Sequence, residues 1–275
     1  RPGVISTLMS FHGRTISTAS ATGQSSHRER YNPLMPSYHF VPYNDVDAVA
    51  RIIKDDIAAV IVEPIQGEGG VIVPADDYLA RLSDLCEANG VMLILDEIQT
   101  GFFRTGPIFA SSPYELKVDF MTMAKGIAGG FPFGAFAMTE EISKRLSIGD
   151  HGGTYCGNPL GCAVSHAVIR YMLDNSIQDN VEAISRYVFD EARSWQREYP
   201  QLIVDVRGKG LLIALEFSDE KPVEELRNRC LSNGLILNVT QKKTVRIFPA
   251  LNITKGEMEE GLRIFKNALD GCARP

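Results

Sequence analysis

The amino-acid sequence predicts an α/β fold, with a mostly parallel sheet and helices on both of its faces, followed by a smaller α+β part. Residues 58–63 and 91–95 are short, continuous apolar runs, as is typical of strands buried on both faces. Between them, residues 76–89 carry apolar side chains at helical spacing, and Gly90 follows as a stop signal. A strand, a helix and a strand in this order predict a right-handed βαβ unit.

Further strands are expected on both sides of this unit. Residues 1–6 are similar to the start of a strand, and residues 118–122 and 134–138 are expected to form strands around a glycine-rich turn. In open α/β sheets, ligands bind beyond the carboxyl ends of the strands. Asp96 follows the apolar run 91–95 and therefore lies at such an end.

The pattern changes near Pro159, where we expect a boundary between a large domain, residues 1–156, and a small C-terminal domain, residues 157–275. A last helix is predicted to begin near Thr254, because Thr254-x-x-Glu257 is a capping-box pattern. The other elements predicted after the boundary are helices over 159–173, 181–199 and 222–232, a strand pair over 203–217 broken at 208–210, and strands over 235–239 and 245–248.

Composition excludes several kinds of function. The 275 residues carry a net charge of -6, with a pI near 5.5, which argues against nucleic acid or an anionic membrane as the main partner. No apolar run approaches the roughly 20 residues of a membrane helix. No signal peptide is recognisable, so we expect a cytoplasmic protein.

The cysteines and histidines are scattered along the chain. The five cysteines form no Cys-x-x-Cys motif and the five histidines no His-x-x-x-His pair, so the sequence predicts no metal site. Reduced and mostly buried thiols are expected of Cys86, Cys156, Cys162, Cys230 and Cys272.

Lys125 and Asp96 form the most informative pair. Lys125 lies in the glycine-rich stretch 124–130, downstream of the carboxylate that ends an apolar strand. Pyridoxal phosphate chemistry needs such a pair, because the amine forms a Schiff base with the aldehyde and the carboxylate keeps the pyridine nitrogen protonated. A solvated surface lysine and an ordinary strand-end carboxylate would match the spacing as well.

Five motifs, in this order, make the chain similar to the class III, or omega, aminotransferases. The resemblance runs over nearly the whole chain and implies a fold-type-I, pyridoxal phosphate-dependent transferase. The motifs are FHGRT at 11–15, EPIQGEGG at 63–70, DEIQTG at 96–101 with RTG at 104–106, AKG at 124–126, and HGGTYCGNP at 151–159.

The resemblance implies a role for each matching residue of the cofactor site. Lys125 corresponds to the Schiff-base lysine and Asp96 to the partner of the pyridinium nitrogen. Gln99 corresponds to the residue that binds the phenolic oxygen, and Phe11 to the ring that stacks on the pyridine. Thr154 corresponds to a hydroxyl that reaches the cofactor phosphate of a neighbouring subunit, so a homodimer with an active site at its interface is expected.

Three further residues correspond to the substrate site. The resemblance implies that Arg14 binds a substrate carboxylate and that Arg246 receives the α-carboxylate of glutamate or 2-oxoglutarate. Glu68 corresponds to a glutamate that pairs with Arg246 while the omega-amino substrate is bound, although a structural ion pair is equally compatible. Glu63 is expected to be a structural residue at a strand end and a possible partner of Arg14.

The chain departs from the family before Phe11. Members of the family are longer, and their preceding segment includes a glycine-rich turn whose amides hold the cofactor phosphate. Nothing similar precedes Phe11, and the chain is expected to begin inside a domain. If that turn is truly absent, cofactor affinity and activity should be badly reduced.

Residues 234–240, 245–251 and 149–154 resemble the acetylornithine aminotransferases most. The implied reaction moves the terminal amine of N-acetylornithine to 2-oxoglutarate, giving N-acetylglutamate semialdehyde and glutamate, a step of arginine biosynthesis. Ornithine, 4-aminobutyrate and succinyldiaminopimelate are further candidate donors. An aminomutase or decarboxylase of the same fold, or a cofactor-free and inactive fragment, would also be compatible with the sequence.

Overall fold

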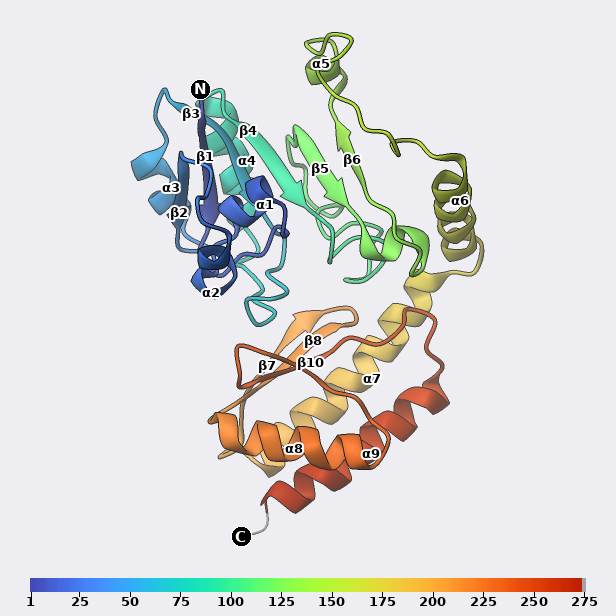
Figure 1. Ribbon diagram of the computed structural model, residues 1–275. Helices are drawn as coiled ribbons and strands as arrows, with labels where there is room; N and C mark the ends of the chain where they lie inside the picture. Colours follow the sequence, from blue (N-terminus) through green and yellow to red (C-terminus); the bar gives the residue numbers. More distant parts are fainter. Residues whose placement is uncertain (274–275) are drawn as a thin grey trace.

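The computed structural model describes residues 1–273, which fold around two separate sheets (Figure 1). The first sheet has six strands in the order β2-β1-β3-β4-β5-β6. All neighbouring pairs are parallel except β5 and β6, which are antiparallel, so β6 is an antiparallel edge strand. The bounds are β1 (Gly3–Thr7), β2 (Tyr38–Val41), β3 (Ile57–Val62), β4 (Met92–Asp96), β5 (Phe120–Met123) and β6 (Ala135–Met138).

The core of this N-terminal part comes from the apolar strands. Val60 and Val62 of β3 and Leu93 and Leu95 of β4 are almost completely buried. Leu82, on α4, is buried against the same cluster, because α4 presents its apolar stripe to the sheet. The helices of this part are α1 (Ile16–Ala21), α2 (Ser25–Arg28), α3 (Val46–Ile52) and α4 (Tyr78–Ala88), with a short 3-10 helix, η1 (Glu29–Tyr31).

The segment after β5 carries the glycine-rich turn. It forms a second 3-10 helix, η2 (Lys125–Ala128), before the chain returns through β6 to α5 (Glu140–Ser143). An extended stretch then leads to α6 (Pro159–Asp174), which packs on η2, as the arch in Figure 1 shows. Helix α6 begins with Asn158 as its N-cap, since the Asn158 side chain accepts a hydrogen bond from Gly161 N at 2.7 Å.

The second sheet is antiparallel, in the order β7-β8-β10-β9. Successive residues of β8 face opposite sides, as the pleat requires. Ile213 and Leu215 belong to the core shared with the C-terminal helices, whereas Leu212 and Ala214 pack on Ile65 of the N-terminal part. The bounds are β7 (Ile203–Lys209), β8 (Leu212–Phe217), β9 (Asn238–Thr240), β10 (Thr244–Ile247), α7 (Ile177–Glu198), α8 (Glu220–Ser232) and α9 (Lys255–Ala273).

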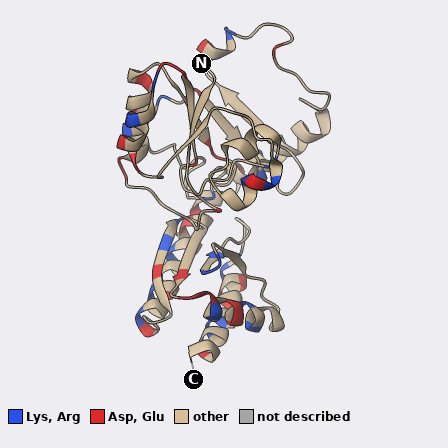
Figure 2. Ribbon diagram, turned by 60° about the vertical axis from the view of Figure 1, so that its left-hand side comes forward, with Lys and Arg blue, Asp and Glu red and all other residues tan. Residues whose placement is uncertain are grey.

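The C-terminal helices cover the outer face of this sheet (Figure 1). Trp195 of α7 is buried and stacks on Phe265 of α9, with ring centroids 5.0 Å apart. Helix α9 begins with the predicted capping box, in which Thr254 N donates to the Glu257 carboxylate and Glu257 N donates to the Thr254 hydroxyl. Lys and Arg mingle with Asp and Glu over the helices of both parts (Figure 2).

The structure confirms the predicted fold class and differs from the predictions in detail. A strand was predicted over residues 235–239, but the observed strand is the shorter Asn238–Thr240. Helix α7 begins at Ile177 rather than at residue 181. The expectation of mostly buried thiols is wrong for Cys156 and Cys162, which are exposed, while all five cysteines are free. The boundary near residues 156–160 stays a prediction.

Two further findings concern residues 1–273. None of the helices in this range is both long enough and apolar enough to cross a membrane. No group of three or more His, Cys, Asp or Glu side chains in the same range is arranged to hold a metal ion.

Candidate functional site

The carboxyl ends of the parallel strands meet at a small polar cavity. Asp96 ends β4, Glu63 follows β3, and Lys125 begins η2 one residue after the end of β5. The volume of the cavity is about 100 Å³. It is lined by five of the eight predicted site residues, Phe11, Glu68, Asp96, Gln99 and Lys125, together with His12, Gly13, Glu63, Ile65 and Ile98.

The amine of Lys125 lies within electrostatic reach of the carboxylates of Glu68, Asp96 and Glu63. Its backbone adopts a left-handed conformation, with φ 48°, which is uncommon for a side-chain-bearing residue and indicates a constrained turn. Burial of the ammonium group lowers the pKa of Lys125, although Glu68, Asp96 and Glu63 act in the opposite direction. The residue keeps exposed surface, so the amine is both accessible and easier to deprotonate than an ordinary lysine.

Asp96 is held by a buried histidine that sequence reasoning did not identify as a site residue. His12 Nδ1 lies 2.7 Å from the Asp96 carboxylate, and Ile98 N donates to the other carboxylate oxygen at 3.1 Å. Burial alone would lower the pKa of His12, but the hydrogen bond to Asp96 and the charges of Asp96 and Glu63 outweigh it and raise that pKa. His12 therefore binds a proton more readily than an ordinary histidine, and an Nδ1–H group donates to the Asp96 side chain and orients it.

Glu63 lines the cavity and is buried. Its carboxylate accepts hydrogen bonds from Phe11 N at 3.2 Å and Gly67 N at 3.4 Å. Burial and the nearby charge of Asp96 nevertheless raise the pKa of Glu63 to about 7. The suggested pairing of Glu63 with Arg14 is wrong: no ion pair joins them in the described structure, and Arg14 is exposed and does not line the cavity.

The predicted ion pair between Glu68 and Arg246 is present. Arg246 Nη1 lies 2.9 Å from Glu68 Oε1 and 3.2 Å from Gln99 Oε1, and Gln99 Nε2 donates to the same Glu68 oxygen at 3.3 Å. Burial alone would raise the pKa of Glu68, but Arg246, Gln99 and Lys125 outweigh it and lower that pKa. Asn238 accepts a hydrogen bond from Arg246 Nε and thereby orients the guanidinium group.

Arg104 is a second buried arginine, and its role was not predicted although it lies in one of the motifs. It donates to the carbonyl oxygens of Leu211 and Pro249, at 3.1 and 2.8 Å, and stacks 3.8 Å from the centroid of the Phe248 ring. Burial, with a contribution from Arg246, lowers the pKa of Arg104 to about 10. Through these bonds Arg104 fixes the segment that follows β10.

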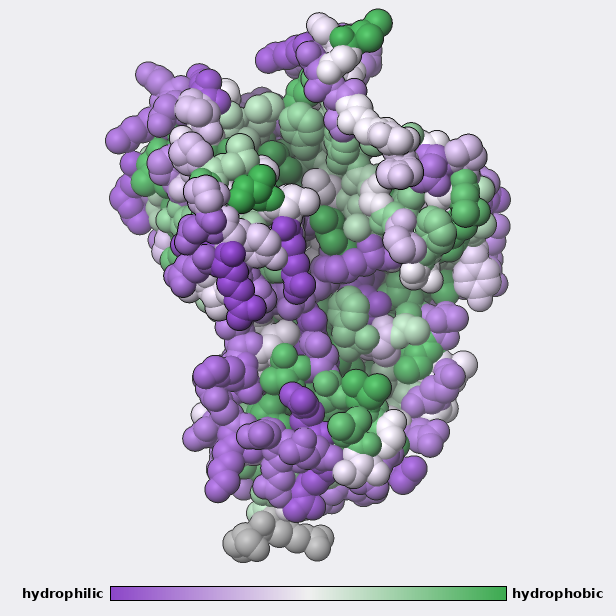
Figure 3. Space-filling model, in the orientation of Figure 1, coloured by the Kyte–Doolittle hydropathy of each residue, from purple (hydrophilic) through white to green (hydrophobic). Residues whose placement is uncertain are grey.

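A second, larger cavity also includes Lys125. It measures about 750 Å³ and lies between α6 and the segment 248–252, where apolar side chains gather at the junction of the two parts (Figure 3). Arg104, Tyr171 and Phe248 are among the residues that line it. Lys125 therefore lines both cavities.

Thr154 lies apart from Lys125. It is exposed on the extended stretch before α6, at a surface hollow that also includes Phe136 and His151. The two cavities that contain Lys125 do not include Thr154. Its predicted role toward a neighbouring subunit stays a prediction.

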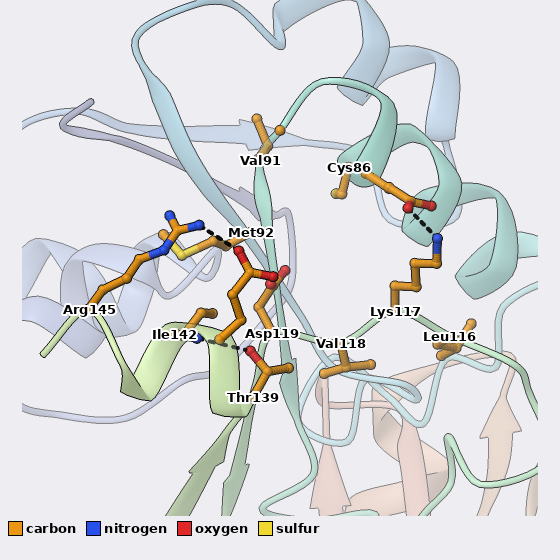
Figure 4. A pocket seen from close by; sticks show the side chains of 13 residues that line it. Cys86, Val91, Met92, Leu116, Lys117, Val118, Asp119, Thr139, Ile142 and Arg145 are labelled. Atoms are coloured by element: carbon orange, nitrogen blue, oxygen red, sulfur yellow. Dashed lines mark hydrogen bonds and ion pairs between the residues drawn. The ribbon is translucent and has the colours of Figure 1, made fainter.

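Another cavity, of about 640 Å³, opens at the amino ends of β4 and β5, far along the strands from Asp96 (Figure 4). Its charged side chains are already paired: Lys117 with Glu87, and Arg145 with Glu141 at 2.7 Å. Asp119 accepts a hydrogen bond from Leu93 N at 2.8 Å. Because these charges are neutralised locally, this cavity is a weaker candidate for chemistry than the one around Lys125.

Comparisons with known proteins agree with this geometry. The family described as aminotransferase class-III matches residues 1–269. Acetylornithine aminotransferase of Clostridium acetobutylicum is 41% identical over 94% of this chain and 67% of its own length. The enzyme of the same name from Methanothermobacter thermautotrophicus is 38% identical over 97% of this chain and 67% of its own length.

Solved structures show the same likeness. Ornithine aminotransferase from Toxoplasma gondii ME49 superposes with a TM-score of 0.92 and 32% identity, covering 98% of this chain and 65% of that one. An aminotransferase of Bacillus anthracis gives a TM-score of 0.92 at 27% identity, covering 98% of this chain and 69% of that one. The chain thus spans about two thirds of the length of these relatives.

Proposed function

This chain belongs to the class-III aminotransferases, a pyridoxal phosphate-dependent family, and we propose that it transfers the terminal amine of N-acetylornithine to 2-oxoglutarate. The products are N-acetylglutamate semialdehyde and glutamate. The observation that carries the proposal is the Glu68–Arg246 ion pair beside Lys125, because this arrangement suits an enzyme that must accept two differently charged substrates in turn. The names of the sequence relatives support the choice of donor.

The residues around the polar cavity fit the cofactor of this family. An amine with a lowered pKa, a carboxylate held by the His12 imidazole and an aromatic ring lie around one small space. We assign Lys125 to the cofactor aldehyde, Asp96 to the ring nitrogen, Gln99 to the phenolic oxygen and Phe11 to the ring face. When bound, the cofactor supplies an electron-withdrawing ring next to the substrate carbon.

The protein's own groups perform the proton transfers. Because burial lowers the pKa of Lys125, its amine loses a proton more easily than that of an ordinary lysine, and Lys125 Nζ can take a proton from the amine-bearing carbon of the donor and return one to the acceptor. Asp96 must stay ionised throughout, and His12 stabilises that state through its short hydrogen bond.

Substrate selection follows from the ion pair. A donor that presents a terminal amine brings no α-carboxylate to Arg246, so Glu68 can stay on the guanidinium group. 2-Oxoglutarate carries an α-carboxylate, which can replace Glu68 and bind Arg246 through two parallel hydrogen bonds. Arg14 is assigned to the other substrate carboxylate, although its side chain is exposed in this structure.

A half-reaction screen tests the proposal. The protein loaded with pyridoxal phosphate is mixed separately with acetylornithine, ornithine, 4-aminobutyrate and succinyldiaminopimelate, and the absorbance change of the bound cofactor is followed. We expect acetylornithine to react with the largest kcat/KM and the Lys125→Ala variant to show no reaction. A response to 4-aminobutyrate without one to acetylornithine would overturn the choice of donor.

Ornithine is the second candidate donor. Its support is the likeness to the Toxoplasma gondii ornithine aminotransferase, whose TM-score of 0.92 accompanies 32% identity. The two donors differ by an acetyl group on the α-amine, so ornithine carries an extra positive charge near neutral pH. A larger kcat/KM for ornithine than for acetylornithine in the same screen would favour this second donor.

A homodimer is part of the proposal, with Thr154 reaching the cofactor phosphate of the other subunit. The exposed apolar side chains of Tyr155 and Leu160, next to Thr154, support a contact surface here. Sedimentation should give a dimer. Co-refolding inactive Lys125→Ala with Thr154→Ala should restore activity, because each mixed dimer then holds one intact site. Absence of restoration in proven mixed dimers would contradict the assignment.

A further inference from the structure

The turn that carries Glu68 is held in an unusual backbone conformation. Gln66 and Ile72 close it with two hydrogen bonds between their main chains, of 3.1 and 3.0 Å. Within it, Gly70 has φ 108° and Val71 has φ 55°. A β-branched residue such as valine rarely adopts a left-handed conformation, so surrounding contacts must stabilise this turn.

Arg207, on β7, supplies part of that stabilisation. Its Nη2 donates to Gly70 O at 2.7 Å, and its Nε lies 3.1 Å from both Gly70 O and Val71 O. Its Nη1 meanwhile contacts Asp205 at 2.7 Å and Glu216 at 2.6 Å. The two carboxylates orient the guanidinium group, and the opposite edge of the group holds the turn.

Gln241 contacts the same turn from the β9–β10 hairpin, at the edge of the C-terminal sheet opposite to β7. It lies between β9 and β10 with φ 48°, and its Nε2 donates to the backbone oxygen of Glu68 at 2.8 Å. The same nitrogen lies 3.2 Å from the Gln24 side-chain oxygen. The main chain of Glu68 is thus fixed independently of its carboxylate, which binds Arg246.

We propose that Arg207 and Gln241 are positioning residues that hold the Glu68 main chain in place while its carboxylate alternates between binding Arg246 and leaving it. This inference rests on the proposed two-substrate function. In this inference the Glu68 side chain moves and the turn does not. The turn is held because Arg207 and Gln241 bind three of its carbonyl oxygens, those of Glu68, Gly70 and Val71. The sheet that carries Arg246 therefore also sets the position of the group that masks it.

The test uses two variants that loosen the turn by different routes. Arg207→Lys keeps the charge beside Asp205 and Glu216 but cannot reach both carbonyl oxygens of the turn, and Gln241→Ala removes the bond to Glu68 O. Lys243→Gln is the matched control, because Lys243 pairs with Glu216 at 3.0 Å and does not contact the turn. All three proteins are first compared with the unchanged chain by hydrogen exchange of residues 67–72.

Selectivity is the functional readout. We expect both variants, but not the control, to lower the ratio of kcat/KM for the terminal-amine donor to kcat/KM for L-glutamate by about fivefold or more, since a poorly held Glu68 masks Arg246 less well. Faster exchange in the turn without a change in this ratio would overturn the inference. An equal loss toward both substrates would also overturn it, since that pattern indicates a merely structural role.

A binding measurement separates this inference from the proposed function. Glutarate, a dicarboxylate that cannot react, is titrated calorimetrically into the chain and its variants. Tighter glutarate binding by Arg207→Lys and Gln241→Ala would support the inference, whether or not any donor reacts. A failure of every donor to react would overturn the proposed function alone. Unchanged glutarate affinity in variants whose turn exchanges faster would overturn the inference alone.

Discussion

Glu63, His12 and Asp96 are buried ionisable side chains that line the same cavity. The three residues are 6%, 5% and 4% exposed. Burying three charges together is costly, and the raised pKa values of Glu63 and His12 show how the site limits this cost. Near neutral pH Glu63 is therefore partly protonated, which reduces the charge buried in this space.

Glu63 should therefore make stability depend on pH. Because its folded-state pKa, about 7, lies above the ordinary value of 4.5, the folded state binds the proton more tightly and loses stability as pH rises from 4.5 through 7. We expect Glu63→Gln to remove this loss, up to about 3 kcal/mol between pH 5 and pH 8. Urea unfolding at both pH values measures the difference; an equal pH dependence in exposed Glu260→Gln and in Glu63→Gln would contradict it.

His12 should act on the cofactor through Asp96. We expect His12→Asn to weaken pyridoxal phosphate binding by about 10-fold or more, as for other residues that orient a ligand-binding carboxylate. Absorbance titration of the bound cofactor measures the affinity. His39→Asn, at an exposed position, is the control, and equal affinities in the two variants would show that the His12–Asp96 bond has no such role.

Sequence reasoning found the reactive residues but not their supports. Lys125, Asp96 and Glu68 belong to short motifs that can be recognised locally. The His12–Asp96 bond joins residues 84 positions apart, and no local pattern distinguishes such a histidine from one in the core. Arg14 is the opposite case. Its motif predicts that it binds a substrate carboxylate, but its exposed side chain does not line the cavity.

Helix α6 supports the turn that presents Lys125. Val168 lies against Gly129, where an added Cβ atom would approach Val168 Cγ2 to 3.2 Å. Gly129 also has φ 57°, so glycine suits this position on two grounds. The start of α6 should consequently matter for the stability of the Lys125 turn.

Loss of the α6 N-cap should be measurable. Asn158→Ala removes the hydrogen bond from Gly161 N and is expected to lower the free energy of unfolding by about 1 kcal/mol. His166→Ala, on an exposed position of the same helix, should cause no loss, because alanine favours helix formation. Thermal or urea unfolding followed by circular dichroism compares the two; equal stabilities would contradict the prediction.

The strongest local patterns were the easiest elements to predict. The apolar runs that became β3 and β4 and the stop at Gly90 could be located to within a few residues, because burial on both faces leaves a continuous apolar signal. Strand β2 and helix α3 were not predicted from the sequence, and β9 proved shorter than expected. These elements depend on pairing with distant segments, which a single sequence does not reveal.

The two parts of the chain meet closely at Gly210. An added Cβ atom there would lie 2.5 Å from Arg104 O and from Thr105 C, and Gly210 has φ 56°. The contact is between main chains, so no flexible side chain can move aside. Together with the bonds from Arg104 to Leu211 and Pro249, it fixes how the C-terminal sheet lies against the Lys125 site.

Gly210→Ala should therefore destabilise the chain by more than backbone strain alone. Gly234→Ala is the control, since Gly234 has φ 84° but open space around it. We expect Gly210→Ala to cost about 1–3 kcal/mol more than the control, the range of overpacking in a filled interior. Urea midpoints measure the difference, and equal midpoints would mean that the two main chains can separate without loss.

Trp195 is the one tryptophan of the chain, and its stacking on Phe265 places it within the C-terminal core. Its fluorescence is thus a built-in optical probe of that core, whereas far-ultraviolet circular dichroism averages over every helix and strand. If both signals change at the same urea concentration, the two parts unfold as one cooperative unit. If the two signals change at different urea concentrations, the transition seen by fluorescence is that of the C-terminal core, and no added label is needed to identify it.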